Sequence, residues 1–191
     1  MRAFVLGLVV ASLALLGGSA WAQEGSDKQS DGQFTGIAMV TDDLDWYDLF
    51  QRPEPPEISG PDRFEAGERG ALVIIFSNAE ARDGVAKVMC DITAFDPTGS
   101  HLVAQSETCY EGPYAGPNIL HPALLDLQFE IGPSDPPGQA GFEITLRDAH
   151  SGREVALKVA FTQGAGACPA RARSSSSCSP SSWCGTPPQS A

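Results

Sequence analysis

The sequence predicts an all-β fold, a single antiparallel sandwich of seven strands with one short helix near residues 43–50. Three observations lead to this prediction. Apolar and polar residues alternate through most of residues 33–163, which is the period of strands with one buried face. Turn-forming Pro, Gly, Asp and Ser residues separate these runs at short intervals. The chain has 191 residues, which suits one domain with a hydrophobic core and flexible ends.

Each of the seven strands is predicted from its own run of residues. Residues 71–76 are apolar on both faces, which is typical of a central strand of a sandwich. The sequence Asp96-Pro97-Thr98-Gly99 has the residue order of a type I turn, so the run after it should return as the hairpin partner of the run before it. In chain order the predicted strands are 33–40, 71–76, 85–95, 101–105, 125–131, 142–146 and 155–161.

The segment between the first two strands departs from the alternation. Thr41, Asp42 and Asp43 can cap a short helix that continues through Phe50, with acidic side chains in its first turn. The proline-rich run at 52–57 then ends any helix and favours an extended path. We therefore expect one helix near 43–50, followed by a rigid connection.

The first 22 residues have the layout of a cleavable secretory signal peptide. A positively charged start precedes an apolar run from Phe4 to Leu16, and Ala20-Trp21-Ala22 has the small-residue pattern of a cleavage site. This run is shorter than the roughly 20 apolar residues needed to cross a bilayer, although a membrane anchor is the alternative interpretation. We expect a periplasmic or secreted protein with no transmembrane anchor in the mature chain.

Both ends of the expected mature chain differ in composition from the predicted sandwich at 33–163. Residues 23–32 are polar, so we expect a disordered linker there. Residues 164–191 contain no acidic residue and are rich in Ser, Pro and Ala, so we expect a disordered tail. The abrupt change also suggests the hypothesis of a shifted reading frame, which resequencing would test. The tail holds three cysteines that match no zinc-site spacing and leave intermolecular pairing open: Cys168, Cys178 and Cys184.

A resemblance to a known family rests on two stretches. Ala66-Gly67-Glu68-Arg69-Gly70, followed by an apolar strand, resembles the entry to the second strand of bacterial exported immunoglobulin-like or fibronectin-III-like domains. Residues 137–148 and Ser151-Gly152 are similar to the last two strands of those domains and their hairpin. The resemblance covers residues 66–162 and implies an immunoglobulin-like β-sandwich without enzymatic activity. Phe142 departs from the pattern, because many such domains have a tyrosine there.

Export would place the thiols of this chain in an oxidising setting. Cys90 and Cys109 are the only cysteines in the predicted sandwich, and they flank the turn at 96–99. In a regular hairpin Cys90 would face Gln105, so the chain would have to turn back after Ser106 for the two sulfurs to meet. We favour a Cys90–Cys109 disulfide, and two separate thiols are the alternative.

Charge and motifs argue against several functional classes. The chain carries 12 Lys and Arg against 24 Asp and Glu, a net charge of −12, which repels nucleic acid and anionic lipid. The sequence contains neither a Gly-x-Ser-x-Gly nucleophile elbow nor a phosphate-binding glycine loop. The histidines His101, His121 and His150 share no metal-type spacing. We therefore expect no enzyme, no cofactor and no nucleic-acid partner.

The acidic start of the expected helix is one candidate site. Asp42, Asp43, Asp45 and Asp48 could supply oxygen ligands to a Ca²⁺ ion. Their spacing is not that of an EF-hand loop, which also needs a glycine and a distal glutamate. A solvated, capped helix is the alternative.

Aromatic residues mark two candidate protein-binding segments. Trp46, Tyr47 and Phe50 either pin the helix over an open end of the sandwich or form an exposed patch for a partner. Tyr110 and Tyr114 lie in a predicted loop that either binds a partner or is a packed connection. The leading hypothesis is a non-enzymatic accessory or protein-binding module whose partner is another exported protein. The alternative is a Ca²⁺-stabilised or small-ligand-binding periplasmic domain.

Overall fold

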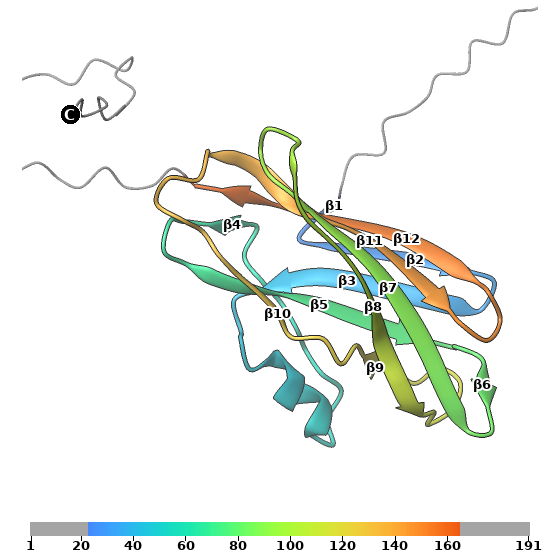
Figure 1. Ribbon diagram of the computed structural model, residues 1–191. Coiled ribbons are helices and arrows are strands. Elements are labelled where there is room, and N and C mark those ends of the chain that lie inside the picture. Colours follow the sequence, from blue (N-terminus) through green and yellow to red (C-terminus); the bar gives the residue numbers. More distant parts are fainter. Residues whose placement is uncertain (1–22, 165–191) are drawn as a thin grey trace, which may run out of the picture.

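The computed structural model describes residues 23–164, which form two β-sheets packed face to face (Figure 1). The predicted signal peptide at 1–22 and nearly all of the predicted tail, with Cys168, Cys178 and Cys184, lie outside the described residues. In the part that is described, no helix has the length and apolar character needed to span a bilayer.

The larger sheet has seven strands and the smaller sheet has five. The order in the larger sheet is β1 (Gln23–Glu24), β12 (Glu154–Gln163), β11 (Gly138–Asp148), β7 (Val85–Phe95) and β6 (Ala81–Arg82), with β4 (Arg63–Phe64) beside β12 and β8 (His101–Pro113) beside β7. The order in the smaller sheet is β10 (Leu127–Glu130), β5 (Arg69–Ser77), β3 (Phe34–Thr41) and β2 (Ser26–Asp31), with β9 (His121–Pro122) beside β5.

All seven predicted strands are present, as β3, β5, β7, β8, β10, β11 and β12. The prediction of a purely antiparallel, seven-stranded sandwich is nevertheless wrong. Five further strands join the sheets, and two of them, β1 and β4, pair with β12 in parallel. Four of the five have only two residues, too few to show an alternating pattern in the sequence.

The expected disordered linker at 23–32 is instead largely a strand. β2 pairs with β3 from Ser26 opposite Met39 to Asp31 opposite Phe34. Its composition is polar because it is an edge strand with mostly exposed side chains, and its order comes from backbone pairing with the apolar β3. At Gly25 the chain crosses between the sheets. The Gly25 N–H donates to the Ala160 carbonyl, and the Gly25 carbonyl accepts from the Val40 N–H. This crossing closes one side of the sandwich.

The predicted helix is a 3₁₀ helix, η1 (Trp46–Gln51), which begins three residues later than expected. Asp45 occupies the N-cap position without a side-chain capping bond. The predicted capping residues form turns before the helix: Thr41 Oγ1 accepts from the Asp43 N–H at 3.1 Å, and Asp43 Oδ1 accepts from the Asp45 N–H at 3.0 Å. Local side-chain bonds of this kind compete with an earlier helix start.

The main core lies between the two sheets and includes Phe34, Phe76 and Leu146. A second, smaller cluster covers the outer face of the smaller sheet, where Trp46 packs on Val73 and Ile75 of β5. β5 is therefore buried on both faces, as its uninterrupted apolar run predicts.

Candidate binding cleft

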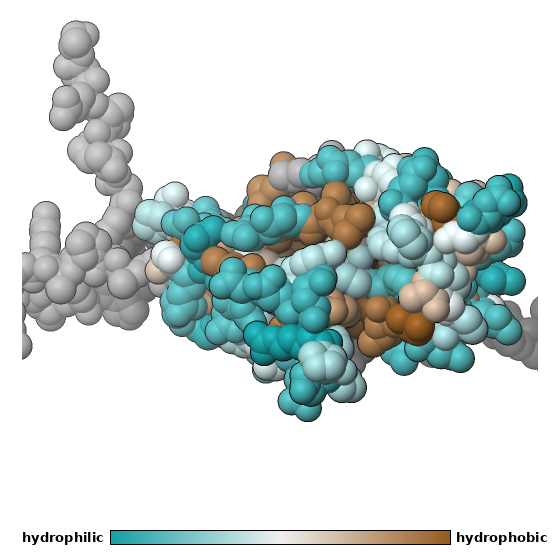
Figure 2. Space-filling model, turned by 90° about the horizontal axis from the view of Figure 1, so that it is seen from below, coloured by the Kyte–Doolittle hydropathy of each residue, from teal (hydrophilic) through white to brown (hydrophobic). Residues whose placement is uncertain are grey.

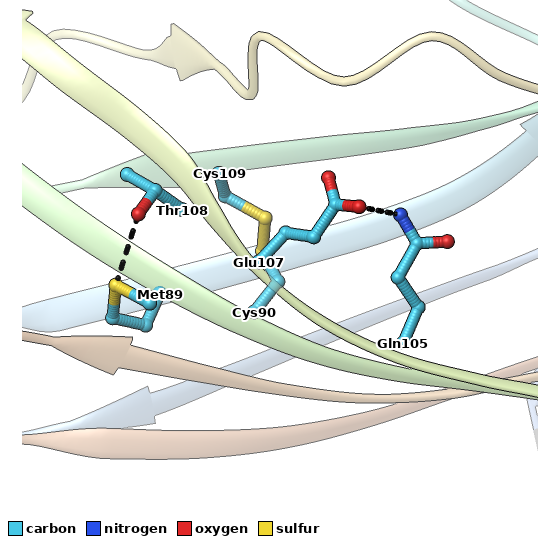
Figure 3. Close-up of a disulfide and its surroundings, with 6 residues drawn as sticks. All are labelled: Met89, Cys90, Gln105, Glu107, Thr108 and Cys109. Carbon is cyan, nitrogen blue, oxygen red and sulfur yellow. Dashed lines mark hydrogen bonds between the residues drawn. A yellow bond between two sulfur atoms is a disulfide. The ribbon is translucent and has the colours of Figure 1, made fainter.

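A buried disulfide joins the neighbouring strands β7 and β8, and Figure 3 shows it between Cys90 and Cys109. The two Cα atoms lie 5.6 Å apart, and both side chains are fully buried. The predicted pairing of these cysteines is confirmed. The bridge lies within one sheet and fastens the edge strand β8 to β7, the one strand of residues 23–164 that pairs with it.

The predicted route of the chain between the cysteines is wrong. β8 does not turn back after Ser106 but continues beside β7, with Cys90 opposite Glu107. Val88 then faces Tyr110 while Met89 faces Thr108, so Cys109 is the extra residue of a β-bulge. At the bulge the Cα atoms of Cys90 and Cys109 lie 5.6 Å apart, closer than the roughly 7–8 Å between diagonal neighbours in regular register.

β8 is an edge strand of the larger sheet. In the part of the chain that the structure describes, no strand pairs with the edge of β8 that faces away from β7. The connection between β9 and β10 covers this edge only at one place, where the Leu124 N–H donates to the Cys109 carbonyl at 2.7 Å. The stretch from His101 to Thr108 is left as an open edge.

A cleft of about 360 Å³ lies where β8 faces the other sheet across the open side of the sandwich. Its walls are mainly apolar and come from both sheets. The floor includes Phe129, which stacks on Phe161 with ring centroids 4.9 Å apart and lies 5.7 Å from Phe142. The apolar side chains that line it include Ile92, Ala94, Leu102, Leu127, Phe129 and Phe142.

Leu102 stands at the mouth of this cleft and is 64% exposed, compared with 54% for Leu124. It is the extra residue of a second bulge in β8, because Val103 faces Ala94 while His101 faces Phe95. Seen from below, the face that carries η1 and β9 shows apolar residues across its middle, with hydrophilic residues around them (Figure 2). Exposed apolar residues that gather on one face can mark an interaction site.

The polar residues of the cleft are acidic or neutral. Glu130 and Asp135 contribute carboxylates, and no Lys or Arg among residues 23–164 lines the cleft. Gln105 lines the wall formed by β8, and its side-chain amide donates to Glu107, as Figure 3 shows. The cleft therefore combines an apolar floor with a negatively charged rim.

The aromatic residues predicted as a patch on the helix differ in how far they are buried. Trp46 is only 3% exposed and contacts Tyr47 and Phe50 edge-on, with ring centroids 5.7 Å and 6.1 Å away. It pins η1 onto the outer face of the smaller sheet, rather than over an open end of the sandwich. Tyr47 remains 38% exposed and lines a second, more open cleft with Leu124.

The second pair of predicted aromatic residues belongs to a packed cluster. Tyr114 stacks on His121 at 5.1 Å between ring centroids, and Tyr110 meets the same ring edge-on at 5.5 Å. The Tyr110 hydroxyl donates to the Pro113 carbonyl at 2.6 Å. Burial raises the pKa of both tyrosines. Of the two alternatives, a partner-binding loop or a packed connection, this arrangement corresponds to the packed connection.

His121 is a buried residue whose role the sequence does not reveal. Its ring lies parallel to that of Phe76, with centroids 5.4 Å apart, and its Nε2 has no hydrogen-bond partner within residues 23–164. Burial lowers the pKa of His121, so the ring is held in its neutral form at neutral pH.

The predicted Ca²⁺ site is not formed. Asp42, Asp43, Asp45 and Asp48 do not converge, and residues 23–164 contain no group of three or more acidic, His or Cys side chains placed to hold a metal ion. Asp43 is instead used in a turn, where it accepts from the Asp45 N–H.

Asp148 is a completely buried acid at the turn between β11 and β12. Its Oδ2 accepts from the Glu80 N–H at 2.8 Å and from the Ser151 hydroxyl at 2.5 Å, and its Oδ1 accepts from the His150 N–H at 3.0 Å. Burial by itself would raise the pKa of Asp148, but these donors lower it overall. The turn sequence indicates an acid that bonds its own loop, whereas the bond to Glu80 has no signal in the sequence.

Comparisons with known proteins show no family. No protein-family model matches the sequence, and no curated protein matches it. One similar solved structure is a family 123 glycoside hydrolase from Clostridium perfringens, with 10% identity and a TM-score of 0.39 over 68% of this chain. The chain spans only 27% of that hydrolase. Another is the PmoD soluble domain from Methylocystis sp. ATCC 49242 (Rockwell), with 15% identity and a TM-score of 0.29 over 72% of this chain and 96% of that domain. Neither likeness is close enough to bear on function.

Proposed function

We propose that this chain is a non-enzymatic binding module that acts outside the cytoplasm and engages another exported protein at the open side of its sandwich. The observation that carries the proposal is the apolar cleft between β8 and β10, with Leu102 exposed at its mouth. Apolar surface left uncovered at a sandwich edge is costly in water, and a partner that covers it recovers the hydrophobic free energy.

The disulfide supports the extracytoplasmic setting. Cys90 and Cys109 are buried at bonding distance, and structural disulfides persist in oxidising compartments. The signal-peptide pattern at 1–22 supports the same location, periplasmic or secreted. The immunoglobulin-like relationship is part of this proposal, and the hairpin of β11 and β12 across Ser151-Gly152 is the feature that supports it.

The way the acids are used supports a binding role over catalysis. Asp135 in the cleft accepts from the Gly132 N–H at 2.7 Å, so it shapes a turn. Both oxygens of Asp148 are occupied by donors of its own turn and of Glu80. A general acid or base needs a carboxyl group that is free to exchange protons with a substrate.

A small apolar ligand is the second candidate, because the cleft volume of about 360 Å³ lies within the range of about 300–1,000 Å³ typical of small-molecule sites. Native mass spectrometry of the exported protein would separate the two candidates. A bound small molecule that is absent from the Leu102→Asp variant would favour the ligand. A protein partner lost from the same variant would favour the module.

Site-specific photo-cross-linking tests the proposal. A photoreactive amino acid is placed at Leu102, and at Ala156 as a control on the exposed outer face of β12. We expect one protein from the exported fraction to be linked at position 102 and not at position 156. Equal products at the two positions, or none at 102, would contradict a partner at the cleft.

A further inference from the structure

We infer that acid releases a strap of the chain, residues 115–124, from the sandwich, and that protonation of His121 is the event that releases it. The strap runs from the end of β8 towards β10 and includes β9 (Figure 1). The inference concerns a conformational device within the fold, so it does not depend on what the cleft beside β8 binds.

The strap is attached to the sandwich at few places. Among residues 115–124, His121 and Ala123 are the only buried side chains, and the next residue to pack against the main core is Leu125, directly after the strap. The pairing of β9 with β5 covers only two residues of the strap. At the end of the strap, the Leu124 N–H donates to the Cys109 carbonyl at 2.7 Å. The two buried side chains therefore carry much of the attachment.

His121 is the larger of these two buried side chains. Its ring stacks on those of Phe76 and Tyr114, with centroids 5.4 Å and 5.1 Å away, and Tyr110 meets it edge-on. The residue is 7% exposed, and its Nε2 has no hydrogen-bond partner within residues 23–164. The strap is thus held by a stack of neutral aromatic rings, one of which can take up a proton.

The groups around the His121 ring offer a positive charge no acid to pair with. The titratable groups that face it are Tyr110 of β8 and Tyr114 just after β8, which are neutral below about pH 10, and Phe76 of β5 carries no charge. Asp148 acts on Tyr114, but both its oxygens accept from other donors. Burial is the cause of the lowered pKa of His121, and no charged group of residues 23–164 adds to it.

Two opposing effects act on a protonated His121. The rings of Phe76 and Tyr114 attract a cation through their π faces, which favours the proton. Removal of the imidazolium from water disfavours it, and a buried charge without a counter-ion costs more than such an attraction contributes. The proton is therefore bound where the ring reaches water, and the ring reaches water when the strap leaves β5 and β8.

The direction and size of the pH effect follow from this difference. In the released strap His121 has its ordinary pKa of about 6.5, and in the attached strap its pKa is lower. The attached state therefore has its full stability above about pH 6.5. Below that value the released fraction rises about tenfold for each pH unit, until the pH reaches the pKa of the attached state. Release uncovers the edge of β8 at Cys109 and the ring of Phe76.

Amide hydrogen exchange of the intact chain tests the inference. The N–H groups of Ala123 and Leu124, which donate to the Ile74 and Cys109 carbonyls, report on the attachment. We expect their protection, corrected for the intrinsic effect of pH on exchange, to fall about tenfold between about pH 6.5 and 5.5. Low concentrations of urea should not speed this exchange, whereas they should speed that of amides in β11 and β12, because release exposes far less surface than unfolding does.

Two histidine variants and one titration complete the test. His121→Phe keeps an aromatic ring and should make the protection of Leu124 independent of pH over this range. His101→Phe removes an exposed histidine at the start of β8 and should leave the fall as in wild type. An NMR titration of the wild-type chain measures the pKa of His121 without relying on either variant. A pKa at or above about 6.5, a fall that persists in His121→Phe, or exchange of Leu124 that urea speeds as it does in β11 and β12 would overturn the inference.

Discussion

Replacing Asp148 with alanine removes a fully buried carboxylate that three donors share at the turn between β11 and β12. The Glu80 and His150 N–H groups would lose an acceptor that is itself fully buried, and the Ser151 hydroxyl would lose its partner. Each buried backbone donor left without a partner costs about 1–3 kcal/mol, and we therefore expect Asp148→Ala to lower the free energy of unfolding by about 4 kcal/mol.

Urea unfolding followed by circular dichroism measures this loss. Asp148→Asn is the matched variant, because it keeps the size of the side chain but presents one oxygen in place of two. It should cost less than the alanine substitution. A second comparison is Asp96→Ala, since Asp96 also accepts from N–H groups of its own turn, at Thr98 and Ser100, but lies where water can replace it. Its loss should be smaller than that of Asp148→Ala.

The pH dependence gives an independent check on Asp148. Its pKa is lower in the folded chain than in the unfolded chain, so its contribution to stability is complete above the unfolded value of about 3.8 and declines as the pH falls below it. Asp148→Asn should remove that decline. A loss of under 1 kcal/mol for Asp148→Ala at pH 7 would refute the reasoning that this carboxylate ties the turn to the sandwich.

Three further perturbations follow from the structure. Replacing Cys90 and Cys109 together by alanine should lower the free energy of unfolding by about 3 kcal/mol, measured against wild type in urea, because the loop between them is no longer constrained in the unfolded chain; an unchanged midpoint would contradict this. Burial lowers the pKa of His121, so as the pH falls the unfolded chain binds a proton at a higher pH than the folded chain does, and Tm should fall below about pH 6.5. His121→Phe should remove that fall. If Tm of the variant depends on pH as steeply as that of wild type, other groups cause the fall. Gly36→Ala should destabilise by about 1–3 kcal/mol, since its Cβ would lie 2.7 Å from a Val155 methyl carbon in the core; a stability equal to that of wild type would show that β12 can move aside.

The sequence predicts the long strands well, because one-sided burial imposes a period of two on them. β7 begins and ends at the predicted residues, and the Asp96–Gly99 turn after it forms as expected. β2 escapes prediction because its order depends on pairing with β3, and its own exposed side chains resemble those of a disordered segment. Parallel pairing of β1 and β4 with β12 depends in the same way on tertiary placement, which local pattern does not encode.

The site is less predictable than the fold. The disulfide between Cys90 and Cys109 could be predicted, but the β-bulge at Cys109 could not. No residue type in the sequence marks the one extra residue of that bulge. Aromatic residues were natural candidates for a binding surface, yet Trp46 is buried in packing. The cleft lies beside the edge of β8 that no strand of residues 23–164 covers, and its clearest trace in the sequence is Leu102, an apolar residue beside a turn.

The central claim is that the partner is bound at the cleft beside β8 and not at the more open cleft beside η1. Leu102→Asp and Leu124→Asp make the same change at two exposed leucines, one at each site, so partner recovery from the exported fraction can be compared directly. The account predicts that Leu102→Asp reduces recovery of the cross-linked partner at least tenfold, while Leu124→Asp leaves recovery within twofold of wild type. The reverse order, or equal recovery by both variants, would contradict it.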